Sequence, residues 1–163
     1  PQETQEEESG GSGLSGSRKP RRPDKEDGIR RSQRLLLTWL IETPALFEKI
    51  EGIITADDFV ENLYHQVAQM VFDGHREGNL NPAAILSRFI NDEDQYKEVA
   101  ALFNASLKES LNNEEQKKAF SETVMKVRKN SLDVASRNAK DITQLQEIIR
   151  QQAALKQLHI SLD

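Results

Sequence analysis

The side chains with the greatest potential for chemistry are a pair of carboxylates and two histidines in the first half of the chain. Asp57 and Asp58 could bind a cation or exchange a proton, and His65 and His75 follow them. However, no third ligand lies near the carboxylates, and histidines more than two helical turns apart cannot share one metal ion. The absence of cysteine excludes disulfides and thiolate metal sites. We therefore predict no catalytic, cofactor-binding or metal-ligating residue, and interpret both histidines as surface or packing residues.

The two carboxylates have a structural explanation. Thr55 is a good N-cap residue, and Asp58 stands three positions later, as in a variant of the capping box. Acidic residues are also favoured at a helix N-terminus by the macrodipole. Apolar residues then recur at spacings of three and four: Val60, Leu63, Tyr64, Val67, Met70 and Val71. This pattern predicts one amphipathic helix over 60–77, ended by Gly78.

The same helix signals recur from Arg30 onward. A helix over 31–42 is apolar on all sides and includes Trp39, so we expect it to be central to a core. N-cap residues predict the starts of the other helices. Thr43 precedes a helix over 44–50, Asn81 precedes one over 82–90, and Asp92 caps the next helix. Asn112 or Asn113 opens a long helix, and Asp141, with Gln144 in a second capping box, opens a last helix from 142 almost to the C-terminus. No strand-type alternation is found. The predicted fold is all-α, a bundle of about six helices followed by a C-terminal antiparallel helical hairpin.

Composition divides the chain into three predicted parts. Residues 1–29 are acidic, then rich in glycine and serine, then basic, and are predicted to be a disordered linker. The bundle covers 30–129 and the hairpin 130–163. The basic RKPRRP segment could contact nucleic acid or a membrane, but acidic residues follow it, so a solubilising linker is favoured. The net charge of −5 argues against nonspecific duplex binding. We expect neither a membrane span nor a signal peptide, and, because the chain begins with proline, we expect a fragment of a longer protein.

The hairpin carries more apolar side chains than one helix–helix seam covers. Such a surplus on a terminal element usually indicates a partner. The candidate partner-binding residues are Ile148, Ile149, Gln152, Leu155, Leu158 and Ile160. Gln152 either sets the register of the hairpin as a buried polar residue or faces the partner. The alternative is that the hairpin folds back on the bundle and buries this surplus within the chain.

Several segments resemble one protein family. The segments are RRSQRLLLTWLIETPALFEKI, ITADDF with the histidine-containing helix after it, DGHREGNLNPAAIL, and NAKDITQLQEIIRQQAALKQL. Together they resemble the C-terminal helicase-binding domain of bacterial DNA primase, the DnaG type, over residues 30–163. These motifs consist mostly of packing residues, so they are moderately specific. The charged linker and the terminal hairpin also fit this family.

The resemblance implies a docking module rather than an enzyme. Such a module tethers a primer-synthesising core, a nucleotidyltransferase, to the N-terminal collar of the hexameric replicative helicase, the DnaB type. The module also stimulates the helicase during RNA primer synthesis. The hairpin is the part implied to bind and the bundle the part implied to stimulate. Zinc and a divalent metal are expected only upstream in the parent chain. The implied setting is the replication fork in the bacterial cytoplasm, and this part alone is expected to be a monomer that does not contact nucleic acid directly.

Two alternatives remain from the residues. The N-terminal domain of the replicative helicase shares the bundle and has similar middle helices, but it would self-associate into a ring. A helical nucleic-acid-binding domain is disfavoured by the acidic balance.

Overall fold

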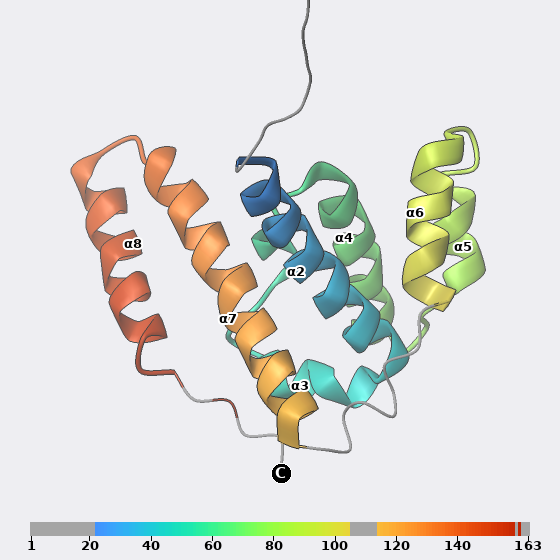
Figure 1. Ribbon diagram of the computed structural model, residues 1–163, viewed down its shortest axis with the longest axis horizontal. Helices are drawn as coiled ribbons and strands as arrows, with labels where there is room; N and C mark the ends of the chain where they lie inside the picture. The colour runs from blue at the N-terminus through green and yellow to red at the C-terminus, as the bar shows by residue number, and fades with distance from the viewer. Residues whose placement is uncertain (1–21, 105–113, 159, 161–163) are drawn as a thin grey trace, which may run out of the picture. The chain divides into compact units, whose positions relative to one another are not determined.

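Helices form all the regular secondary structure in the residues that the computed structural model describes, which are 22–104, 114–158 and 160 (Figure 1). The predicted all-α fold is therefore confirmed. The α-helices are α2 (Arg22–Glu42), α3 (Phe47–Ile50), α4 (Asn62–Arg76), α5 (Pro82–Ser87), α6 (Glu93–Asn104), α7 (Glu114–Arg137) and α8 (Ile142–Leu155), with 3₁₀ turns η1 (Pro44–Leu46) and η2 (Ala56–Asp58). The chain divides into two units, Pro1–Arg31 and Ser32–Asp163. The second is called the bundle unit below.

The first helix begins earlier than predicted. α2 starts at Arg22, so residues 22–29 of the predicted linker belong to a helix. The rest of that linker, residues 1–21, lies outside the described residues. Pro23 falls in the first turn, where a missing backbone N–H leaves no helical hydrogen bond unmade. A proline in a charged segment is therefore compatible with a helix start as well as with a linker.

The core of the bundle unit is built around α2, as the apolar pattern predicted. Leu36, Leu37 and Leu40 are completely buried, and Trp39 is only 3% exposed. The Trp39 ring meets the edge of Phe120 on α7, with centroids 5.4 Å apart and planes 80° apart. This is the T-shaped geometry that aromatic pairs prefer. Helices α4, α6 and α7 supply most of the remaining core: Leu63, Tyr64, Val67, Val71, Val99, Leu102, Phe120, Val124 and Val127.

The segment between α2 and α4 contains more breaks than predicted. Thr43 makes no side-chain cap, although Pro44 opens η1 and the chain continues into α3. Gly52 has φ of 79° and ends this stretch, a conformation that glycine adopts without steric cost. Thr55 caps only the short turn η2, because the helix does not continue beyond it: the next residue, Phe59, is extended and fully buried. Consequently α4 starts two residues after Val60, which is 37% exposed rather than part of the apolar stripe.

A buried amide holds the start of α4. The side-chain oxygen of Gln33 on α2 accepts a hydrogen bond of 3.0 Å from the backbone N–H of Glu61, the N-cap residue of α4. The Glu61 side chain itself makes no cap. Gln33 thus provides from another helix a bond at the helix start, where backbone N–H groups lack partners.

The helix starts in the middle of the chain follow the predicted caps. Asn81 accepts a hydrogen bond from the Ala84 N–H at 3.2 Å, and Asp92 accepts one from the Gln95 N–H at 3.1 Å. α5 ends at Ser87 rather than at residue 90, and Ile90 in the following turn is 67% exposed. The predicted caps of α7, Asn112 and Asn113, lie outside the described residues.

Helix α7 belongs both to the core and to the hairpin. It runs unbroken across the subdomain boundary predicted between residues 129 and 130, with Phe120 and Val127 in the core before that point and Leu132 buried after it. α8 lies beside it in the antiparallel direction, as Figure 1 shows. The bundle unit therefore includes the hairpin, because the first arm of the hairpin is itself a core helix.

The turn of the hairpin is capped by Asp141, as predicted, but the capping box has an altered partner. Asp141 Oδ1 accepts a hydrogen bond from the Gln144 N–H at 2.8 Å. The Gln144 side chain reaches back to the N–H of Lys140, at 2.9 Å, rather than to that of Asp141. The turn therefore has two side-chain bonds, one on each side of the cap residue.

Replacing Asp141 by alanine is expected to cost about 1 kcal/mol, the usual effect of losing an N-cap. Amide hydrogen exchange of the first turn of α8 should accelerate accordingly. Asp141→Asn is the matched control, since asparagine caps as well as aspartate does. Equal exchange in the wild-type chain and in Asp141→Ala would contradict the role assigned to this cap.

Candidate functional site

Helix α8 presents an unusual amount of apolar surface. None of its 14 residues, all of them described, is buried. Ile142 is 70% exposed and Ile149 is 53% exposed. Ala153 is also exposed. These three positions are spaced by seven and four residues, so they share one side of the helix, which we call the outer face.

The side of α8 next to the outer face rests on α7. Its half-buried residues are Leu145, Ile148, Gln151, Gln152 and Leu155. Gln152 Nε2 donates to Asp133 Oδ1 on α7 at 3.2 Å, and Gln151 Oε1 accepts from Arg128 Nη2 at 3.0 Å. Polar bonds therefore contribute to this seam together with aliphatic contact.

The structure separates the six predicted partner-binding residues into three groups. Ile149 lies on the outer face, while Ile148, Gln152 and Leu155 lie on the side facing α7. Leu158 and Ile160 do not belong to α8, because the helix ends at Leu155 and the chain then turns back. Leu158 packs against the core, and Ile160 is a core residue with 9% exposure. For these last two residues, the alternative of folding back on the bundle describes the structure.

Sequence reasoning missed Ile142 as a surface residue of this site. Its position seven residues before Ile149 was the available signal, since residues seven apart fall on the same side of a helix. The Gln152 bond to Asp133 places that half-buried amide against α7.

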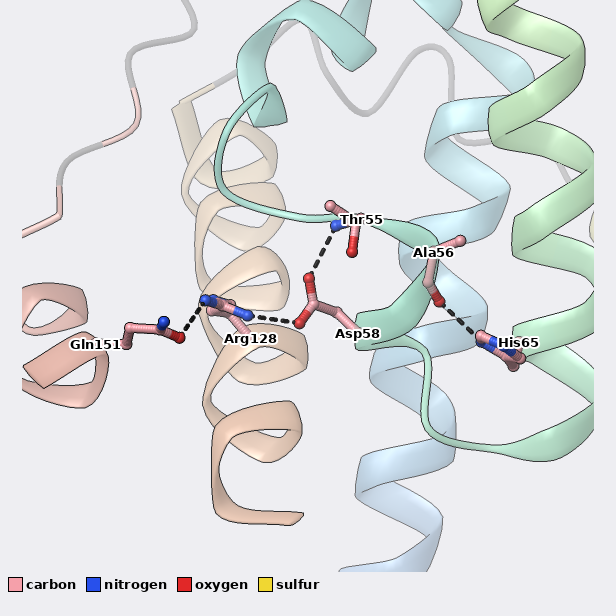
Figure 2. Close-up of polar contacts among 6 residues, drawn as sticks. All are labelled: Thr55, Ala56, Asp58, His65, Arg128 and Gln151. Carbon is pink, nitrogen blue, oxygen red and sulfur yellow. Dashed lines mark hydrogen bonds and ion pairs between the residues drawn. The ribbon is translucent and has the colours of Figure 1, made fainter. Parts of the chain in front are cut away.

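A chain of polar contacts connects η2, α7 and α8, as Figure 2 shows. Arg128 Nη1 donates to Asp58 Oδ1 at 2.7 Å, while Arg128 Nη2 donates to Gln151. The other carboxylate oxygen of Asp58 accepts the Thr55 N–H at 2.8 Å, which is the return bond of the predicted capping box. The Asp58 side chain is 4% exposed and that of Arg128 is 25% exposed. Asp58 thus serves both as a helix cap and as the buried partner of an ion pair.

The two carboxylates lie in different environments. Asp57 is exposed, whereas Asp58 is buried against Arg128. Among the residues that the structure describes, no group of three or more histidine, cysteine, aspartate or glutamate side chains could hold a metal ion. The structural explanation of Asp58 is thus correct, with the addition of an ionic partner that the sequence pattern did not indicate.

The two histidines have packing contacts, as predicted. His65 Nδ1 donates to the Ala56 carbonyl oxygen at 3.0 Å, which ties η2 to α4 (Figure 2). His75 is exposed on one side and stacks on Phe47, with ring centroids 4.0 Å apart and planes 12° apart.

Two hollows border α8. The smaller, of about 160 Å³, lies under its C-terminal half and is lined by Gly52, Ile53, Arg128, Gln151, Ala154, Leu155 and Leu158. The larger, of about 760 Å³, is an open groove near the hairpin turn, lined by Ala135, Asn138, Ala139, Thr143, Gln144, Gln146, Glu147, Ile148 and Arg150. Both hollows are lined by apolar and polar side chains.

Within the described part of the chain, no helix combines the length and the apolar character needed to cross a membrane. Comparison of the chain with protein-family models, with curated proteins and with solved structures finds no match.

Proposed function

We propose that this chain is a protein-docking module and that the outer face of α8 is its contact surface. The observation that carries the proposal is the contrast within α8: no residue of this fully described helix is buried, yet it exposes Ile142 and Ile149. Large aliphatic side chains at helical spacing are the anchors by which a helix is recognised in a groove of another protein. A few such anchors usually account for most of the binding energy.

The proposed partner is the N-terminal collar of a bacterial replicative helicase. Its support is the resemblance of residues 30–163 to the helicase-binding domain of bacterial DNA primase. A core helix, a short helix after Pro44, and a terminal α7–α8 hairpin are elements expected of that domain. In this proposal the chain binds to the helicase and stimulates it. A primer-synthesising core, with its zinc and divalent metal, lies upstream in the parent chain. The setting is the replication fork in the bacterial cytoplasm.

The double variant Ile142→Ala with Ile149→Ala is expected to weaken helicase binding at least tenfold, which corresponds to about 1.4 kcal/mol. The affinity is measured by titration calorimetry with the replicative helicase of the same organism. Both side chains are largely exposed, so the thermal stability of the chain should change little. Leu155 and Leu158 are less suitable for this test, because their substitution would also disturb packing on α7 and on the core.

The matched control is Ile90→Ala. Ile90 is 67% exposed and lies in the turn between α5 and α6, so it is not part of the outer face of α8. Binding should be unaffected by this change. Wild-type affinity in the double variant would show that α8 is not the anchor. Light scattering provides a second test, since assembly of the isolated chain into a ring would favour the N-terminal domain of the helicase instead.

A further inference from the structure

Helix α8 is fixed firmly at its two ends and weakly in its middle. At its start, Asp141 caps the turn that joins it to α7. Beyond its end, Leu158 and Ile160 pack with the core of the bundle unit. Between these points, the side-chain hydrogen bonds that join α8 to other described residues of the unit come from Gln151 and Gln152, and the hollow of about 160 Å³ lies beside Gln151. The middle of α8 therefore lacks the dense packing that would hold a core helix.

The two bonds of Arg128 differ in how easily they can break. Separating Arg128 from Asp58 would leave a carboxylate with 4% exposure without its cation, which is strongly unfavourable. Separating Arg128 from Gln151 leaves a neutral, half-buried amide whose Nε2 also donates to Glu147 at 3.2 Å on the exposed surface. Water can satisfy that amide once the helix moves away. Of the two bonds made by Arg128, the hydrogen bond to Gln151 is therefore the easier to break.

The Gln152 bond has the same character. Its acceptor, Asp133, has a side chain with 38% exposure and also pairs with Lys129. When the bond to Gln152 is lost, Asp133 keeps its cation and gains water. Neither of the two bonds that hold the middle of α8 requires a buried charge to become unpaired.

We propose that Gln151 and Gln152 form a latch, and that its release lets the middle of α8 separate from α7 while both ends of the helix stay attached and Arg128 stays bound to Asp58. This separation exposes the half-buried Leu145, Ile148 and Leu155 and enlarges the hollow of about 160 Å³ that Leu155 lines. The bundle below keeps its ion pair and its capped η2, so it remains folded with the helix open. The inference concerns the chain alone and holds whichever partner binds α8.

The test is amide hydrogen exchange of the full chain, read by mass spectrometry. A short helix that leaves its packing partner is only marginally stable in water, so separation of α8 also opens its backbone hydrogen bonds. Gln151→Ala is therefore expected to accelerate exchange in the middle of α8 by about tenfold, the effect of losing one hydrogen bond to a charged group. Exchange in α2 and α4 should stay unchanged, because local openings of this kind leave the core intact. The double variant Gln151→Ala with Gln152→Ala should accelerate α8 further, again without effect on the core.

Gln146→Ala is the matched control, since Gln146 is an exposed glutamine of the same helix outside the bonded positions. It should leave exchange in α8 as in the wild-type chain. Two results would overturn the latch. In one, Gln151→Ala behaves like Gln146→Ala. In the other, exchange in α8, α2 and α4 rises together, which would make α8 part of a single cooperative unit with the core.

Discussion

Replacing Arg128 by methionine is expected to lower the free energy of unfolding of the bundle unit by about 3 kcal/mol. Methionine keeps much of the aliphatic length of arginine but removes the guanidinium. The Asp58 carboxylate would then remain in an almost fully buried position, where it accepts a hydrogen bond from the Thr55 N–H. A buried charge that loses its counter-ion keeps its desolvation cost without compensation, which is why the expected loss is far larger than for a surface ion pair.

Urea denaturation followed by circular dichroism measures this loss. Lys129→Met is the matched control, because Lys129 is adjacent on α7 and pairs with Asp133 from a side chain that is 73% exposed. Its cost should remain below about 1 kcal/mol. Adding Asp58→Asn to Arg128→Met should restore part of the stability, since asparagine carries no charge to leave unpaired. Similar costs for Arg128→Met and Lys129→Met would show that the buried pair contributes little.

Trp39→Ala is expected to cost about 3–5 kcal/mol, the range for removing a large aromatic side chain from a core. Trp39 is 3% exposed and contacts Phe120 on α7 edge to face. Its indole N–H is buried and has no hydrogen-bond partner among the described residues. The side chain therefore stabilises the fold through its packing, while burial of its unpaired N–H lowers the stability.

Trp39→Phe separates these two contributions. Phenylalanine keeps an aromatic contact with Phe120 and removes the unpaired N–H, so its cost should be well below that of alanine. Thermal unfolding of both variants, compared with that of the wild-type chain, provides the measurement. A Trp39→Ala chain with unchanged melting temperature would mean that α2 is not central to the fold.

The features of this fold that could be predicted from the sequence are local ones. Each cap described above bonds a backbone N–H three residues later, so its partner is near in the sequence; the caps are Asn81, Asp92 and Asp141. The central position of α2 follows from its continuous apolar pattern for the same reason. Such signals do not depend on how distant segments meet.

Features that depend on distant segments were not predictable from these patterns. Arg128 meets Asp58 across 70 residues, and nothing in the Thr55–Asp58 motif indicates that it also needs a cation. At the other end, Leu158 and Ile160 continue the apolar spacing of α8, although the helix has already ended. Periodicity cannot distinguish a helix that continues from a chain that turns back to the core. Of the predicted partner-binding residues, Leu158 and Ile160 therefore lie against the core, while Ile142, which was not among them, is exposed on α8.

The position of Ile160 in the same core as Leu36 has a consequence for the nascent protein. The apolar residues of α2 are translated well before their packing partners on α7, and Ile160 is translated last of this core. At typical rates of synthesis the delay between the first and last of these residues is roughly ten seconds. During that interval α2 can pack only against the helices already made, so part of its apolar surface stays exposed. Exposed apolar surface of this kind makes incompletely folded chains prone to aggregation.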